Sequence, residues 1–171
     1  MSPAGAKPLQ EELDDLVFFI EKSLRYHQRR KGFFEACHRW LMFLIIMLGA
    51  VSAANVFGSS VAFALSSAAI AAVDLVFSLG PRARDHLLLH RRFSVLMAEI
   101  LRTLSLDPTV LAEWQARRVE IVAEEPPIYW ALDRDCYNEV HLARGERDGL
   151  FKLSWAERLF MHFWRFEQIA S

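Results

Sequence analysis

The fold is decided by residues 40–79, which read WLMFLIIMLGAVSAANV (40–56) and SSVAFALSSAAIAAVDLVFSL (59–79) on either side of a short gap. No Asp, Glu, Lys, Arg or His occurs from Trp40 to Val73. Because one membrane-spanning helix needs about 20 apolar residues, this stretch is long enough for two. The Asn, Gly and two Ser residues between Asn55 and Ser60 are typical of a turn. We therefore expect an all-α chain that contains a two-helix transmembrane hairpin.

A buried helical hairpin inside a soluble protein is the alternative. A small domain rarely buries two adjacent uncharged helices on all their faces, and this chain has only 171 residues. Gly80-Pro81 follows the second apolar block and predicts a break or bend there. The expected organisation is an N-terminal cytoplasmic helix (1–39), the hairpin (40–79) and a cytoplasmic helical region (80–171).

Basic residues flank the apolar stretch on both sides, whereas the connecting turn has none. The positive-inside rule therefore predicts that both termini lie in the cytoplasm and that the turn lies outside. Residues 1–12 are polar with two prolines, which is not the pattern of a secretory signal. Trp40 fits an interfacial anchor. The residues expected to contact lipid headgroups are Arg25, Arg29, Arg30, Lys31, Arg39, Arg82 and Arg84.

Asp74 is the only ionisable residue inside the two expected spans. It lies close to the end of the second span, roughly 7 Å inside it at about 1.5 Å per residue. An acidic side chain at the bilayer centre costs about 2.5–3.5 kcal/mol, and less near the edge. Two interpretations stay open: Asp74 pairs with Arg82 or Arg84 or reaches headgroup water, or it takes part in ion conduction.

Small and polar residues form a narrow stripe along the second span at 100° per residue. A stripe of this kind lets helix backbones approach closely. In an oligomer it also lines a wet path, where a ring of carboxylates favours cations. Helix packing is the commoner use, and both uses require the second span to face protein. The stripe consists of Ser60, Ala64, Ser67, Ala71, Asp74 and Ser78.

Amphipathic helices are expected on both sides of the hairpin. Leucines and isoleucine at helical spacing predict a helix from Leu9 through Phe33. After the hairpin we expect helices over about 82–104, from Asp107-Pro108 to near Glu125, and over about 128–144. A last helix opens with the capping box Ser154/Glu157. Its aromatic face suits either the membrane interface or docking on the other helices. The interfacial residues on this face are Trp155, Leu159, Phe163 and Phe166.

The sequence shows no pattern typical of an enzyme. A glycine-rich phosphate loop and a dinucleotide fingerprint are missing. His86 and His90 have metal-compatible spacing but lack an HExxH glutamate and lie beside arginines, so surface or interfacial histidines are expected. The net charge of −1 argues against nucleic acid as a partner. We expect no catalytic residues, no metal, no cofactor, and reduced Cys37 and Cys136.

The residues around the hairpin resemble a known family. Arg25-Tyr26-His27 and His38-Arg39-Trp40 lead into the hairpin, and Asp74-Leu75-Val76-Phe77 and Arg91-Arg92-Phe93 follow. This pattern is similar to the bacterial SLATT proteins, which are two-transmembrane effector modules of conflict systems that sense nucleotides. The resemblance covers about Arg25 to Arg102. It implies an inner-membrane protein that assembles with itself and perforates or depolarises the membrane when a separate sensor or trigger protein signals.

Two functional hypotheses follow. The first is an oligomeric pore-forming or membrane-perturbing effector of a bacterial defence system, in which Ser60, Ser67, Asp74 and Ser78 face a lumen. The alternative is a non-conducting membrane-anchored scaffold or adaptor, in which the hairpin is an anchor and the cytoplasmic helices bind a partner. An enzyme or a transporter subunit ranks last.

Overall fold

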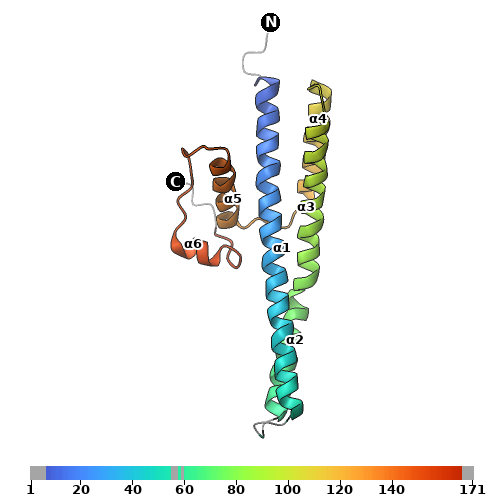
Figure 1. Ribbon diagram of the computed structural model, residues 1–171, viewed down its shortest axis with the longest axis vertical. Helices are drawn as coiled ribbons and strands as arrows, with labels where there is room; N and C mark the ends of the chain where they lie inside the picture. Colours follow the sequence, from blue (N-terminus) through green and yellow to red (C-terminus); the bar gives the residue numbers. More distant parts are fainter. Residues whose placement is uncertain (1–6, 55–57, 59, 167–171) are drawn as a thin grey trace. The chain divides into compact units, whose positions relative to one another are not determined.

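The computed structural model describes residues 7–54, 58 and 60–166. These residues form helices and connecting segments, and no strand occurs among them (Figure 1). The all-α expectation is therefore confirmed. The helices are α1 (Leu9–Ala54), α2 (Ser60–Phe77), α3 (Leu79–Arg102), α4 (Pro108–Ala123), α5 (Trp130–Ala143) and α6 (Trp155–Phe160).

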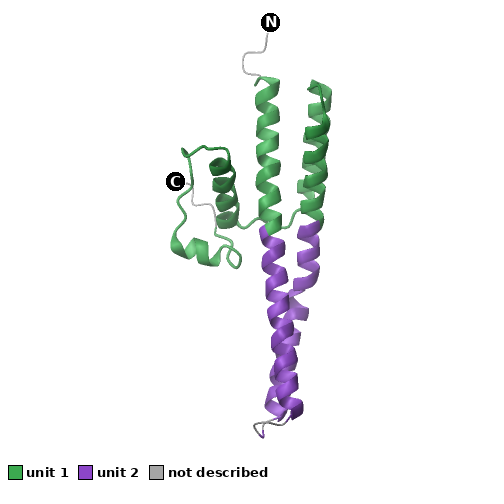
Figure 2. Ribbon diagram, viewed as in Figure 1, with its two compact units in different colours: residues 1–28, 88–171 green, residues 29–87 purple. Residues whose placement is uncertain are grey.

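The chain divides into two compact units (Figure 2). Unit 1 comprises residues 1–28 and 88–171, and unit 2 comprises residues 29–87. Helices α1 and α3 each contribute to both units. This division differs from the expected boundaries at residues 39 and 80, because unit 2 also includes the helical turns on either side of the apolar stretch.

Helix α1 is continuous over 46 residues, so the expected N-terminal helix and the first apolar block form one element. No proline occurs from Leu9 to Ala54, and therefore nothing removes a backbone hydrogen-bond donor within the helix. The expected end of the first span at Val56 lies outside the described residues, as does most of the expected turn. Gly58, in that turn, has φ +65°, a conformation that glycine adopts at no steric cost.

Two helical stretches are apolar and long enough to cross a membrane by length and composition. One lies in α1 and the other in Ser60–Arg102, and no residue in the most apolar window of either stretch is buried inside the protein. Helix α2 has no buried residue. Val61, Leu75 and Val76 expose 71%, 79% and 75% of their surface, respectively. Helix α2 is therefore apolar without being the core helix of a folded domain.

The break after α2 lies at Ser78 and not at Gly80-Pro81, where it was expected. Ser78 has φ +49°, α2 ends at Phe77 and α3 begins at Leu79. Pro81 lies in the first turn of α3. Proline is tolerated there because the first N–H groups of a helix have no intrahelical acceptor.

The core of unit 1 is formed by α1, α3 and α4. Phe93 of α3 and Ile20 of α1 are fully buried in it (both 0% exposed). The other buried members are Leu16, Leu89, Leu96, Ile100, Leu111, Trp114 and Ile121. Ion pairs of Arg92 with Glu124 and of Arg117 with Glu99 join α3 to α4 along their exposed edge.

The expected start of α4 is confirmed. Asp107 is its N-cap, Pro108 is its first residue, and the Asp107 side chain accepts a hydrogen bond from the backbone N–H of Thr109 (2.8 Å). Hydrogen bonds from the Thr109 hydroxyl and N–H lower the pKa of Asp107. Helix α4 ends at Ala123, close to the expected Glu125.

Helix α5 stops before Gly145, as expected, and Gly145 has φ +80°. The capping box of α6 is also confirmed, since Ser154 and Glu157 bond reciprocally. Helix α6 is much shorter than expected and ends at Phe160, so Phe163 and Phe166 lie beyond it. After Phe160 the chain forms only a turn, in which the N–H groups of Phe163 and Trp164 donate to the Phe160 carbonyl (both 2.9 Å).

Candidate functional site

Polar contacts join α2 to residues 38–52 of α1 within unit 2. The Ser52 hydroxyl donates to the Ser60 carbonyl (2.7 Å), and the Ser67 hydroxyl donates to the Ile45 carbonyl (3.3 Å). Nearer the charged end, His38 Nδ1 lies 2.9 Å from Asp74 Oδ1. The residue numbers of each pair add up to 112, so the two helices run antiparallel in one constant register.

The expected stripe on α2 is divided between two environments. Ser60, Ser67 and Asp74 contact α1, as shown above, whereas Ala64, Ala71 and Ser78 are exposed. The partly buried face of α2 is completed by Phe63 and Ile70. Residues 60, 63, 67, 70 and 74 follow the alternating spacing of three and four that a helix–helix seam requires. The contact face is therefore rotated away from the expected stripe toward Phe63 and Ile70.

Asp74 pairs with His38 and not with Arg82 or Arg84. The Asp74 side chain is 18% exposed and that of His38 is 39% exposed. An ionised carboxylate only accepts hydrogen bonds, so His38 Nδ1 is the donor when Asp74 is charged. The sequence carried a signal for this pair, because a turn centred near residue 56 places residue 38 opposite residue 74. The expected partners, Arg82 and Arg84, are the nearest arginines to Asp74 along the chain, whereas the observed partner, His38, is distant in sequence.

The expected headgroup residues do not share one environment. Arg39, Arg82 and Arg84 are exposed, while Arg25, Arg29 and Lys31 are partly buried. Arg30 is only 3% exposed, and its guanidinium lies 4.5 Å from the centre of the Phe34 ring. The expectation of headgroup contact is therefore wrong for Arg30, because a cation–π contact and the surrounding protein cover its side chain.

His86 is buried, although a surface or interfacial position was expected. It is 3% exposed and stacks on Phe34 with ring centres 5.7 Å apart and planes 15° apart. Arg84 and Asp85, its neighbours in sequence, are exposed. Among the residues that the structure describes, no three His, Cys, Asp or Glu side chains are grouped so as to hold a metal ion.

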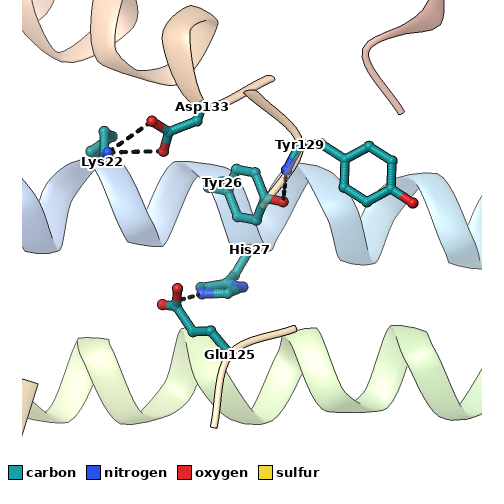
Figure 3. A network of polar contacts seen from close by, with 6 residues as sticks. All are labelled: Lys22, Tyr26, His27, Glu125, Tyr129 and Asp133. Carbon is teal, nitrogen blue, oxygen red and sulfur yellow. Dashed lines mark hydrogen bonds and ion pairs between the residues drawn. The ribbon is translucent and has the colours of Figure 1, made fainter. Parts of the chain in front are cut away.

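A polar network in unit 1 links α1 to the segment between α4 and α5 (Figure 3). His27 Nε2 lies 3.1 Å from Glu125 Oε1, and the Tyr26 hydroxyl accepts a hydrogen bond from the Tyr129 N–H (3.0 Å). One turn earlier, Lys22 pairs with Asp133 (2.8 Å). The His27 side chain is 1% exposed and stacks on Phe93, with ring centres 5.7 Å apart.

Our sequence reasoning missed this network, although helical spacing contained a signal for it. The leucine stripe of α1 continues from Ile20 in steps of three and four through Ser23, His27, Arg30 and Phe34, all of which are buried. The expected stripe contained only apolar residues and ended at Leu24, so it did not include the polar members. Polar residues at core positions of a helix need partners, and such positions are candidates for specific contacts.

The segment 151–166 docks on α5. Asn138 exchanges two hydrogen bonds with the Phe151 backbone (2.8 Å each), and Arg134 pairs with Glu157 (3.8 Å). Met161 is 6% exposed and packs with Tyr26, Ala131, Leu132 and Cys136, and Phe166 packs against this cluster. Of the expected interfacial residues, Phe166 is thus turned inward. Trp155, Leu159 and Phe163 are 77%, 60% and 66% exposed, respectively.

Cys37 and Cys136 are not joined by a disulfide bond. Cys136 is buried in the cluster around Met161 and Cys37 is partly buried. Burial raises the pKa of the Cys37 thiol, while the Arg30 charge acts in the opposite direction. A thiol with a raised pKa is less often in the reactive thiolate form, so Cys37 does not have the character of a nucleophile.

Comparison with models of protein families, with curated proteins and with solved structures finds no match to this chain.

Proposed function

We propose that the chain is an integral membrane protein whose apolar part of α1 and α2 cross the bilayer as a hairpin, with both termini in the cytoplasm. The exposure of α2 supports this proposal, because burying a Val, Leu or Phe side chain gains about 1.5–3 kcal/mol and α2 buries none. In a bilayer, lipid chains cover the exposed apolar side chains of α2 and so remove them from water. The exposed Arg39, Arg82 and Arg84 lie next to the apolar stretch, as the positive-inside rule requires of cytoplasmic flanks.

Within the membrane, we propose that the protein acts as an oligomeric pore-forming or membrane-perturbing effector. The observation that carries this proposal is Asp74 inside the otherwise uncharged second span, paired with His38 just before the first span. Ionisable residues are rare in spans and commonly mark ion or proton pathways. In the single chain the pair is satisfied between α1 and α2, which suits a closed state. Opening of that contact in an assembly would free Asp74 to face a lumen.

Self-assembly is supported by the outer surface of α2. Ala64, Ala68 and Ala71 are exposed along one side of the helix and leave room for another helix backbone to approach. Two helices by themselves do not enclose a lumen, so a pore needs several copies. The resemblance to SLATT proteins supports the same function and adds a bacterial inner membrane and a separate trigger protein.

A non-conducting anchor is the second candidate. It is favoured by the contacts of Ser67 and Asp74, which are both bonded to α1 and need no further partner. In this case the polar groups only hold the hairpin together, and unit 1 supplies the function by binding a cytoplasmic protein.

Asp74→Asn separates the two candidates, and Asp85→Asn is the matched control. Asp85 is exposed on α3 and its loss removes the same charge outside the apolar stretch. The full chain is expressed in bacteria under tight control, and membrane potential is followed with a dye. An effector depolarises the cells, and Asp74→Asn changes this effect while Asp85→Asn does not. Equal depolarisation by both variants removes Asp74 from the mechanism. Stable, harmless insertion of the parent chain favours the anchor.

A further inference from the structure

The end of the described chain presents an aromatic surface that the helical core does not use. Met161 of this segment packs against α5, whereas five of its large apolar side chains are exposed. Trp155 and Trp164 are 77% and 68% exposed, and Leu159, Phe160 and Phe163 are 60%, 46% and 66% exposed. We call these five residues the aromatic patch. The paired Asn138 hydrogen bonds and the Arg134–Glu157 pair hold the segment, so the patch does not simply fold inward.

Segment 151–166, which carries the patch, has more basic than acidic residues. Lys152, Arg158 and Arg165 are exposed within or beside the patch. The one acidic residue of segment 151–166 is Glu157, whose carboxylate is already engaged by Ser154 and Arg134. A surface of tryptophan, phenylalanine and leucine with interspersed basic residues suits the headgroup region of an anionic membrane. There the apolar side chains enter the boundary with the acyl chains, and the basic side chains approach the lipid phosphates.

A hollow of about 770 Å³ adjoins the patch and shares Phe163 and Trp164 with it. Tyr129 and Phe166 add further aromatic walls. Arg134 and Arg165 supply two guanidinium groups, and Glu157, which pairs with Arg134, supplies one carboxylate. This volume lies within the range of about 300–1,000 Å³ that is usual for small-molecule sites. Arginine recognises phosphate through its planar set of donors. The two guanidinium groups outnumber the one carboxylate in the lining, so the hollow suits an anionic headgroup.

We propose that the aromatic patch lies in the interfacial region of an anionic lipid leaflet and that the adjoining hollow holds a lipid phosphate. Unit 1 then has a membrane contact of its own, in addition to the hairpin. This inference rests on the proposed membrane location of the chain, but it makes a separate claim. The hairpin alone would leave the patch in water or against protein.

The test uses the full chain in nanodiscs of phosphatidylcholine with or without phosphatidylglycerol. A fluorescent amino acid is placed genetically at position 159, and quenching by lipids that carry a nitroxide is measured. The same amino acid at position 142, where Leu142 of α5 is 53% exposed, is the control for a site outside the patch. At position 65, where Leu65 of α2 is 66% exposed, it reports the hairpin.

The expected result is strong lipid quenching at position 159 in anionic discs, less in neutral discs, and none at position 142. Arg158→Glu should weaken docking of the patch about 30-fold, since each basic residue near an anionic surface contributes about 1 kcal/mol and the reversal counts twice. Arg102→Glu, an equal charge change at the exposed end of α3, should leave the quenching unchanged.

Three other outcomes are informative. Quenching at position 65 without quenching at position 159 overturns the inference and leaves the proposed hairpin intact. Protection of position 159 from aqueous iodide without lipid quenching shows that protein covers the patch, and this result also overturns the inference. Quenching at position 159 without quenching at position 65 supports the patch and contradicts the proposed hairpin.

Discussion

The buried His27–Glu125 contact should contribute measurably to the stability of unit 1. Glu125→Ala removes the carboxylate that lies 3.1 Å from His27 Nε2. The two side chains are 1% and 10% exposed, so water cannot easily replace the lost partner. A hydrogen bond with a charged group contributes about 1.5–3 kcal/mol, and we expect a loss of that size. Glu125→Gln keeps an oxygen that accepts a hydrogen bond and should therefore lose less than Glu125→Ala.

Glu124→Ala is the matched control, because it makes the same change at the preceding residue. The Glu124 side chain is 61% exposed and pairs with Arg92, which is 39% exposed. Exposed ion pairs contribute about 0.2–1 kcal/mol. In a chain of this length each kcal/mol corresponds to about 2–4 °C in Tm. The expected decrease is therefore about 3–12 °C for Glu125→Ala and at most about 4 °C for Glu124→Ala.

Thermal unfolding of the full chain in detergent micelles measures both variants. Circular dichroism follows the helices, and hydrogen exchange at residues 124–129 follows the segment that Glu125 ties to α1. Glu125→Ala should lower Tm and speed exchange in this segment, whereas Glu124→Ala should do little of either. Equal effects of the two alanine variants would refute the reasoning, because burial would then not decide the contribution.

Three further predictions address the core, the register and the pH dependence. Phe93→Ala should cost about 3–5 kcal/mol, because it empties a fully buried site, and thermal unfolding measures the loss. Ile45→Cys/Ser67→Cys, in a background without native cysteines, should form an intrachain disulfide with copper phenanthroline, detected by mass spectrometry. Hydrogen bonds from the backbone and hydroxyl of Ser154 lower the pKa of Glu157. The contribution of these hydrogen bonds to the stability of the folded segment is complete above pH 4.5, the ordinary pKa of a glutamate. It is lost as the pH falls through the lower pKa that Glu157 has in the folded chain. Mobility of a spin label at position 159 should therefore rise below pH 4.5, and Glu157→Gln should abolish the dependence.

Each of these predictions has a control within the chain. Leu142→Ala, at a site that is 53% exposed, should change stability by less than about 0.5 kcal/mol. Cysteines at Ile46 and Ala68, which are both exposed, should not bridge. A similar loss at Leu142 and Phe93, or bridging of the 46/68 pair, would contradict the burial and register described above. A spin label that is equally mobile at pH 6 and pH 3.5 would contradict the contribution of Glu157.

Helical content and its local signals were readable in the sequence. Asp107-Pro108 and the pair Ser154/Glu157 predicted the starts of α4 and α6, because a cap depends on residues within one turn of each other. Gly145 predicted the end of α5 for the same local reason. The length of α6 was wrong, because apolar periodicity continues past Phe160 although the chain turns there so that Met161 packs against α5.

Partners of the polar residues depended on the tertiary structure. The sequence placed Asp74 inside an apolar span, but the antiparallel register decided that His38 holds it. The same is true of Arg30, which was expected at lipid headgroups, and of His27, because their positions on α1 place both side chains in the interior. Composition and spacing act within a few residues, so the sequence alone determined an all-helical chain with an uncharged stretch long enough for two spans. Contacts between residues far apart, such as His27 with Glu125, arise only when several helices pack, and the structure decided them.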